Sequence, residues 1–191
     1  MSTLTDDPVE LPAPGPKKHR TRRQLIEWTV VILAAFVTAI VLRVAVVQAF
    51  SIPSVSMERT LLVGDRVLVN KLSGGDTPHR GQVVVFKRPP GEEAAAIKDL
   101  IKRVIGLPGD TVSAENGRLY LNGKPLSEPY LQPGTRTVMD HPFTVPPGHV
   151  FVMGDNRTQS RDSRFFGPIT IKSIVGRAFI RVWPPNRVGR L

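Results

Sequence analysis

The sequence contains no cysteine and only four histidines. The absence of cysteine excludes a thiol nucleophile, a disulfide framework and a cysteine-ligated zinc site. The histidines do not occur in a His-Glu-x-x-His or similar spacing, so we expect no metal site and no cofactor. The sequence also lacks a Gly-x-Ser-x-Gly motif, which disfavours a serine–histidine–aspartate triad.

Long apolar runs are scarce as well, because only Trp28 to Phe50 reaches a membrane-sized length, and Arg43 interrupts it. A helix of about 20 residues is about 30 Å long, close to the hydrocarbon thickness of a bilayer. An arginine near the outer end can extend its stem to the interface, which lowers its cost. The run therefore predicts one transmembrane helix over residues 25–48. A basic start before an apolar core is also typical of a cleavable secretory signal, which remains the alternative.

The net charge of +10 is typical of proteins that bind nucleic acid. Here, however, one dense block of basic residues directly precedes the apolar run: Lys17, Lys18, Arg20, Arg22 and Arg23. Such a block favours the cytoplasmic side of a membrane and attracts anionic lipid headgroups. We therefore predict a disordered, basic cytoplasmic tail over residues 1–24, whose proline-rich composition cannot form a core. The protein is expected in the cytoplasmic membrane as a single-pass protein, with the bilayer as partner and no nucleic acid.

After Phe50 the sequence consists of short segments rich in β-branched residues, separated by turns that contain glycine and proline. This pattern predicts an extracytoplasmic all-β domain over residues 49–191. We expect its strands at 66–70, 82–86, 97–105, 118–121, 150–153 and 174–182. The dipeptide Asn122-Gly123 is typical of a tight hairpin turn.

A serine-rich turn, Ser51 to Glu58, begins where the apolar run ends, so its hydroxyl groups are expected at the membrane surface. A serine can act as a nucleophile with a lysine base if burial lowers the lysine pKa from its usual value of about 10.4. Lys102 is the best candidate, because strand alternation places Leu100, Lys102 and Val104 on one face. From the spacing alone, a lysine that protects an edge strand from aggregation fits equally well.

Several short blocks combine hydroxyl, glycine and charged residues in an order that is informative as a set. They are Ser54-x-Ser56-Met57, Gly64-Asp65-Arg66-Val67-Leu68-Val69-Asn70-Lys71, Arg80-Gly81-Gln82-Val83-Val84-Val85-Phe86, Lys102-Arg103-Val104-Ile105-Gly106-Leu107-Pro108-Gly109-Asp110, and Gly154-Asp155-Asn156-Arg157 followed by Ser160, Asp162, Ser163 and Arg164. Any one block could arise by chance. Together, behind an apolar anchor, they cover most of residues 43–168 and resemble the bacterial type I signal peptidase (leader peptidase) family of serine–lysine membrane proteases.

The resemblance implies a mainly β fold: an antiparallel β-sheet catalytic domain of the type I signal peptidase (LexA-like peptidase) kind, preceded by one transmembrane helix. It implies a membrane-bound serine endopeptidase that cleaves amino-terminal signal peptides from exported preproteins, after small residues at the −1 and −3 positions. Preprotein signal peptides are then the expected partner, no cofactor is needed, and a monomer is expected. The interval from Asp110 to Gly154 is short for the family, so a second, non-catalytic β subdomain at about 111–149 should be small.

The resemblance also implies a role for each site residue. Ser56 attacks the scissile carbonyl, while neutral Lys102 takes its proton and later protonates the leaving amine. The Ser54 hydroxyl and the Ser56 backbone amide form the oxyanion hole, and Ser160 hydrogen-bonds and orients Lys102. Structural ion pairs are expected beneath the site, in a pairing that the sequence does not show, among Arg103, Asp155, Asp162 and Arg164.

Two positions depart from the family pattern, because Val55 stands where glycine is usual and Arg59 where proline is usual. A β-branched residue resists positive φ, so we expect an extended backbone at Val55. A further question concerns the apolar residues around the nucleophile, which suit either the outer lipid leaflet or the protein core: Phe50, Ile52, Leu61 and Leu62.

Two other functions are compatible with parts of the sequence. A soluble serine–lysine repressor that cleaves itself would suit the net charge, but it needs a DNA-reading helix pair that the proline-rich first 24 residues do not supply. A membrane-anchored binding module would use the serines only to shape a turn. Loss of all hydrolysis in Ser56→Ala, with the fold intact, would discard the binding module.

Overall fold

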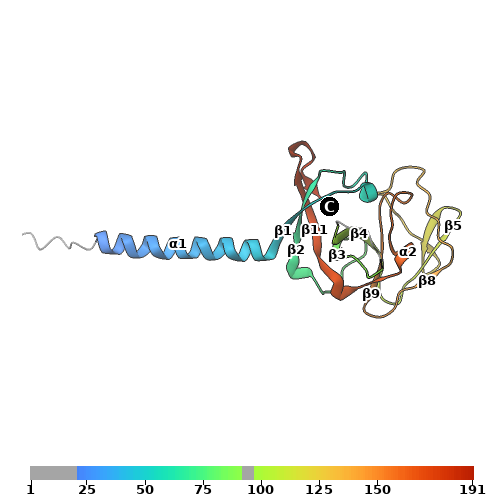
Figure 1. The fold of residues 1–191 in the computed structure, drawn as a ribbon, viewed down its shortest axis with the longest axis horizontal. Helices are drawn as coiled ribbons and strands as arrows, with labels where there is room; N and C mark the ends of the chain where they lie inside the picture. Colours follow the sequence, from blue (N-terminus) through green and yellow to red (C-terminus); the bar gives the residue numbers. More distant parts are fainter. Residues whose placement is uncertain (1–20, 92–96) are drawn as a thin grey trace, which may run out of the picture. The chain divides into compact units, whose positions relative to one another are not determined.

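A computed structural model describes residues 21–91 and 97–191 of the chain (Figure 1). Contacts between residues divide the chain into two units, which meet between Val41 and Leu42. Most of the predicted tail, including Lys17, Lys18 and Arg20, lies outside the described residues, as does the side chain of Arg43.

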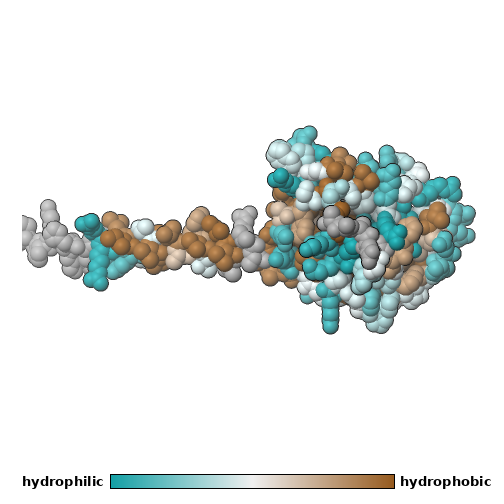
Figure 2. All heavy atoms as spheres, viewed as in Figure 1, coloured by the Kyte–Doolittle hydropathy of each residue, from teal (hydrophilic) through white to brown (hydrophobic). Residues whose placement is uncertain are grey.

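Helix α1 spans Thr21–Val46, and its residues up to Val41 form the described part of the first unit. Its apolar side chains are exposed on all sides rather than on one face, and Figure 2 shows them along the described part of the helix, with polar residues at its start. The segment Arg22–Val41 has a mean hydropathy of 2.0 and is long and apolar enough to cross a membrane. A helix that is apolar all round needs an apolar environment, which a bilayer provides.

The ends of α1 differ from the predicted range of 25–48. The helix is already formed at Thr21, the first described residue, and residues 22–24 belong to it, because arginine and glutamine are good helix formers. It ends at Val46, because Val47–Ser51 pairs with a neighbouring strand. The backbone hydrogen bonds of residues 47 and 48 therefore belong to a sheet and not to a helix.

Most strands of the second unit form one sheet of eight antiparallel strands in the described residues (Figure 1). Its order is β1–β2–β11–β3–β4–β9–β10, and β12 pairs with β11. Its strands are β1 (Val47–Ser51), β2 (Arg66–Asn70), β3 (Val83–Lys87), β4 (Asp99–Gly106), β9 (His149–Met153), β10 (Ile169–Thr170), β11 (Ile174–Trp183) and β12 (Gly189–Arg190). The mainly β, antiparallel fold predicted from the sequence is confirmed.

A small second sheet lies within the predicted subdomain at 111–149. Its strands, in the order β7–β6–β5–β8, are β5 (Thr111–Glu115), β6 (Arg118–Leu121), β7 (Lys124–Pro125) and β8 (Phe143–Thr144). The Asn122-Gly123 turn joins β6 to β7, and both residues have positive φ, 52° and 75°. Asparagine and glycine tolerate this conformation, so the predicted hairpin is confirmed.

Short helical elements connect the strands. They are α2 (Ser163–Phe166) and the 3₁₀ turns η1 (Val55–Met57), η2 (Lys71–Ser73), η3 (Ile171–Ser173) and η4 (Pro185–Arg187). The turn η1 follows β1 and carries the candidate nucleophile in its middle position.

The large sheet is buried on both faces, which explains why β3 is a continuous apolar run rather than an alternating one. Val83 and Val85 pack in one buried cluster, whereas Val84 and Phe86 pack in another. Ile52 and Leu61 also belong to the first cluster, so for these two the structure supports the core alternative rather than the lipid leaflet. Leu62, in contrast, is 38% exposed, and Phe50 is partly buried against the same cluster.

Candidate active site

Ser56 and Lys102 are 46 residues apart in the sequence but are in direct contact in the structure. Lys102 Nζ donates a hydrogen bond to Ser56 Oγ at 2.5 Å. Both side chains are buried, with 6% of Ser56 and 3% of Lys102 exposed. This is the contact that a serine nucleophile and its base require.

The position of Lys102 follows from the strand that carries it. Strand β4 has β3 on one side and β9 on the other, and Lys102 lies opposite Val84 of β3. The predicted face is confirmed, because Leu100 and Val104 both pack in the cluster that contains Val84. A lysine that protects an edge strand would extend into solvent, and the buried Lys102 does not fit that alternative.

The buried environment changes the ionisation of Lys102. Burial lowers its pKa from 10.5 to about 8, because removing the ammonium ion from water disfavours the charged form. The carboxylates of Asp162 and Asp155 oppose this shift, and the cations of Arg164 and Arg88 add to it. A substantial neutral fraction is therefore present at mildly alkaline pH, as a general base requires.

Ser54 lies beside the nucleophile, with its Oγ 3.3 Å from Ser56 Oγ. The backbone around Ser56 is held by the loop after β9, because Asn156 N donates to the Ser56 carbonyl at 3.1 Å. Gly154 permits this close approach, since a Cβ there would lie 2.4 Å from the Ser56 carbonyl and 2.2 Å from Ser160 Oγ. A side chain at residue 154 is thus incompatible with the site as it stands.

Asp162 is fully buried and organises the segment behind Lys102. It accepts hydrogen bonds from Ser160 Oγ at 2.7 Å and from the Gly154 amide at 2.9 Å, and it forms an ion pair with Arg164 at 2.9 Å. The sequence prediction had Ser160 bonded directly to Lys102. In the structure the Ser160 hydroxyl donates to Asp162 instead, because a carboxylate is the stronger acceptor, and Lys102 donates to Ser56.

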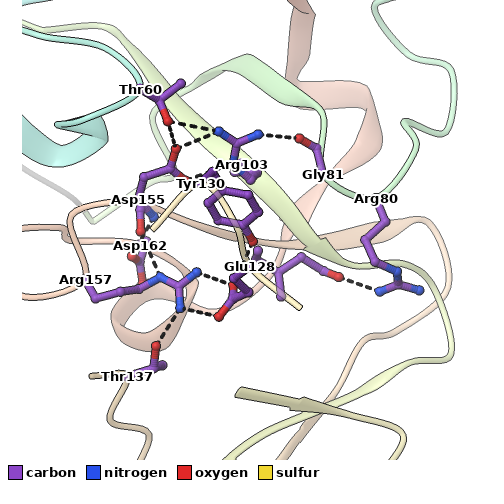
Figure 3. A network of polar contacts seen from close by, with 12 residues as sticks. Thr60, Arg80, Gly81, Arg103, Glu128, Tyr130, Thr137, Asp155, Arg157 and Asp162 are labelled. Carbon is purple, nitrogen blue, oxygen red and sulfur yellow. Dashed lines mark hydrogen bonds and ion pairs between the residues drawn. The ribbon is translucent and has the colours of Figure 1, made fainter. Parts of the chain in front are cut away.

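The second predicted ion pair is Arg103–Asp155, which Figure 3 shows from close by. Arg103 donates to both Asp155 oxygens, at 2.9 and 2.7 Å. Asp155 also accepts from Thr60 Oγ1 at 2.5 Å, and the Tyr130 ring lies 4.0 Å from the Arg103 guanidinium carbon. The pairing that the sequence left open is thus Arg103 with Asp155 and Arg164 with Asp162.

Sequence reasoning missed a neighbouring buried network. Arg157 forms an ion pair with Glu128 and donates to Thr137 Oγ1 at 2.5 Å, while Tyr130 donates to Glu128 at 2.7 Å (Figure 3). These contacts connect the segment between β7 and β8 of the small sheet to the loop that holds the Ser56 carbonyl. The only sequence signal was Arg157 itself, which lies in a family-like block without an assigned role.

The turn that carries Ser56 differs from the sequence expectation at Val55. Val55 begins the 3₁₀ turn η1, so the predicted extended backbone there is wrong. The turn is closed by a hydrogen bond from Glu58 N to the Val55 carbonyl at 2.9 Å. The positive φ of this region falls instead on Arg59, at 80°.

Arg59→Pro, which introduces the residue usual in the family, is therefore expected to destabilise the protein. Proline fixes φ near −65°, far from the 80° observed at Arg59, and the change also removes the contact of the guanidinium with the Leu131 carbonyl. We expect a loss of about 2–3 kcal/mol in the free energy of unfolding, measured by denaturant titration. Arg59→Gly removes the same side chain but relieves the φ strain, so it should be clearly more stable than Arg59→Pro. Equal stabilities for the two variants would contradict the assigned conformation.

Alternative chemistries find no support in this geometry. The nitrogen that contacts Ser56 Oγ belongs to Lys102 and not to a histidine. In the part of the chain that the structure describes, no group of three His, Asp or Glu side chains could hold a metal ion. The absence of a metal and a cofactor from the reaction stays a prediction.

Comparisons with known proteins identify similar sequences along most of the chain. A family profile described as signal peptidase, peptidase S26, matches residues 25–183. The signal peptidase I of Leptolyngbya laminosa is 39% identical over 198 residues, covering 100% of this chain and 97% of the relative. The probable signal peptidase I-2 of Synechocystis is 42% identical, covering 83% and 73%, and the signal peptidase I of Bacillus caldolyticus is 41% identical, covering 75% and 83%.

Among solved structures, the crystal structure of a signal peptidase I from Enterococcus faecalis is 34% identical. It covers 53% of this chain and 97% of that chain, with a TM-score of 0.45. The sequence relatives and the family profile, which together extend over nearly the whole chain, identify a serine peptidase, a hydrolase. The chain belongs to the signal peptidase family, peptidase S26.

Proposed function

We propose that this peptidase cleaves the amino-terminal signal peptides of exported preproteins with Ser56 as nucleophile and Lys102 as general base. The observation that carries this assignment is the buried contact of 2.5 Å between Lys102 Nζ and Ser56 Oγ. The alternative of a binding module, in which the serines only shape a turn, gives no reason for burying a lysine against a hydroxyl group.

The reaction follows from this contact in two stages. Neutral Lys102 takes the Ser56 proton as Oγ attacks the scissile carbonyl carbon, and the resulting ammonium gives a proton to the leaving amine when the C–N bond breaks. The signal peptide is then an ester on Ser56. Lys102, neutral again, takes a proton from water, whose hydroxide attacks the ester carbonyl, and the Ser56 oxygen recovers that proton as it leaves.

Free strand edges support binding of the substrate as an added strand. Among the described strands, β1 pairs only with β2, and the Asp99–Lys102 part of β4 pairs only with β3, because pairing with β9 begins at Arg103. Strand β1 precedes the turn that carries Ser56, and the free part of β4 contains Lys102. A substrate strand would point alternate side chains into the protein, which would restrict the −1 and −3 residues and tolerate variation at −2.

The helix α1 is proposed as a membrane anchor with its amino terminus in the cytoplasm. Its apolar exposed surface and the basic residues before it support this orientation, which places Ser56 on the extracytoplasmic side near the bilayer. Protease added to spheroplasts should digest the second unit and spare the tail. The reverse digestion pattern would show the opposite orientation.

The proposed activity is tested directly with purified full-length protein in detergent. Incubation with a preprotein should release a signal peptide cut after small residues at −1 and −3, as mapped by mass spectrometry. Substrates with a bulky residue at −1 or at −3 should resist cleavage, whereas one with a bulky residue at −2 should be cut. Cleavage at scattered sites, or none, would contradict the proposed function.

Ser54→Ala is expected to lower kcat by about 10²–10³, with a smaller effect on KM. We propose that the Ser54 hydroxyl donates to the oxyanion, a charge that exists only in the transition state, so its loss affects kcat most. Ser54→Thr keeps a hydroxyl group and should retain much of the activity. Similar losses in both variants would indicate that Ser54 acts only through packing.

Cleavage should rise with pH through the folded-state pKa of Lys102, which is about 8. The neutral amine is the base, so kcat/KM should fall about tenfold for each pH unit well below that value. The measurement is kcat/KM from pH 6 to pH 10, with circular dichroism to verify folding at each pH. A midpoint near 6.5 would point to a histidine instead, and a flat profile would remove Lys102 from the rate-determining chemistry.

A further inference from the structure

The second unit, which carries the catalytic residues, also has a groove on its surface. None of the residues assigned to catalysis lines this groove. It has a cavity volume of about 340 Å³ and is open to solvent. Val46, Val47 and Phe179 contribute apolar surface, and Asn70, Gln82 and Arg177 contribute polar groups. A water molecule takes up about 30 Å³ in the liquid, so the groove is much larger than a bridging water needs.

Arg177 has fewer partners than comparable arginines in the described structure. Arg80, Arg103, Arg157, Arg164, Arg181 and Arg187 each contact a carboxylate. Arg177, which is half-buried, instead donates to the Thr77 carbonyl at 3.2 Å, and its buried Nε has no partner among the described residues. A guanidinium has five N–H donors, and an unpaired buried donor is unfavourable, so this side chain is suited to receive an anion.

The two amides of the groove add donors and no free acceptor. Asn70 Oδ1 accepts from Leu72 N at 3.0 Å, and Gln82 Oε1 accepts from His79 N at 2.9 Å. These bonds fix the amide orientation and leave the two NH₂ groups as the remaining polar ends. No Asp or Glu side chain lines the groove. A lining of one cation and two NH₂ groups fits a phosphate or another oxyanion.

The apolar side of the groove indicates which class of molecule carries that anion. Only residues 42–45 separate Val46 and Val47 from the apolar segment Arg22–Val41 in the chain. An extended residue spans at most about 3.6 Å. The few residues between Val41 and Val46 therefore keep the groove near the surface of a membrane in which the segment Arg22–Val41 is inserted. An anion beside the half-buried valines and the exposed Phe179 ring then matches a phospholipid, whose phosphate lies next to its acyl chains.

We propose that this groove binds the headgroup phosphate of an anionic phospholipid, with Arg177, Asn70 and Gln82 as donors to the phosphate. The proposal rests on the membrane anchoring in the proposed function. A zwitterionic lipid carries an additional cation, for which the groove offers no carboxylate, so phosphatidylglycerol should bind better than phosphatidylcholine. The bound lipid would fix the catalytic unit at the bilayer surface, beside the membrane-inserted substrate.

The test is lipid binding to the full chain in detergent micelles, followed by native mass spectrometry during titration with phosphatidylglycerol, phosphatidylcholine or inorganic phosphate. Arg177→Gln should weaken phosphatidylglycerol binding by about tenfold, the effect of losing one charge-assisted contact. Gln82→Glu keeps the oxygen that accepts from His79 N and adds a negative charge, so it should weaken binding as strongly without affecting the fold. The matched control is Arg190→Gln, which removes the same charge from an exposed position on β12 outside the groove.

The expected result is a single phosphatidylglycerol that Arg177→Gln and Gln82→Glu lose and Arg190→Gln retains. Equal weakening in all three variants would indicate diffuse charge attraction and overturn the proposal, as would unchanged binding in Arg177→Gln. Equal binding of phosphatidylcholine, or binding of inorganic phosphate as tight as that of the lipid, would overturn the assignment to an anionic lipid. Preprotein cleavage is measured separately, so an inactive wild-type protein that binds lipid contradicts the proposed function alone.

Discussion

Lys102→Arg is expected to abolish cleavage while the protein remains folded. Arginine keeps a positive charge and a similar length, but its guanidinium does not deprotonate in proteins and cannot accept the Ser56 proton. Serine proteases that lose their base lose about 10⁴-fold or more in kcat. The measurement is single-turnover cleavage of a preprotein by the full-length variant, with circular dichroism to verify the fold.

Three further variants make this result specific. Lys98→Arg changes an exposed lysine just before β4 and should be fully active. Ser56→Ala should be as inactive as Lys102→Arg, and the double variant should be no worse than either, because the two residues act as one unit. Cleavage by Lys102→Arg near the wild-type rate would end the serine–lysine assignment.

The elements that the sequence predicted well are those fixed by local patterns. Apolar segments bounded by glycine and proline located five strands of the large sheet (β2, β3, β4, β9 and β11) but not the short or edge strands β1, β10 and β12, and Asn122-Gly123 located a hairpin. The face of Lys102 followed from alternation alone. Its burial did not, because burial depends on the strands on either side of β4, which come from distant parts of the chain.

The contacts that the sequence did not reveal join residues that are far apart or depend on backbone detail. Arg157 lies 29 residues from Glu128, and nothing in either local sequence indicates that they pair. The backbone at Val55 was mispredicted because avoidance of positive φ is compatible with helical as well as extended backbone, and the positive φ of this turn is at Arg59. Ser160 was placed in the site correctly, but its partner depended on the position of Asp162, which only the fold determines.

Replacing Lys102 with methionine is expected to stabilise the protein at neutral and acidic pH. The folded-state pKa of about 8 lies below the value of 10.5 for an exposed lysine, so the folded state binds the proton more weakly than the unfolded state. Between these two values the unfolded state carries more protons, and wild-type stability rises with pH. Below pH 8 both states are protonated, and burial of the ammonium costs about 3 kcal/mol. Methionine is similar in length and avoids this cost.

The stability difference between Lys102→Met and wild type should therefore be largest below pH 8, up to about 3 kcal/mol, and should shrink as pH rises from 8 to 10.5. It is measured by denaturant unfolding of the full chain in detergent at pH 6, 8 and 10. Lys98→Met, at an exposed position, should show no such pH dependence. A methionine variant that is less stable than wild type by the same amount at every pH would show that Lys102 stabilises the fold. A more stable but inactive variant would mean that the burial of Lys102 serves catalysis and lowers the stability of the domain.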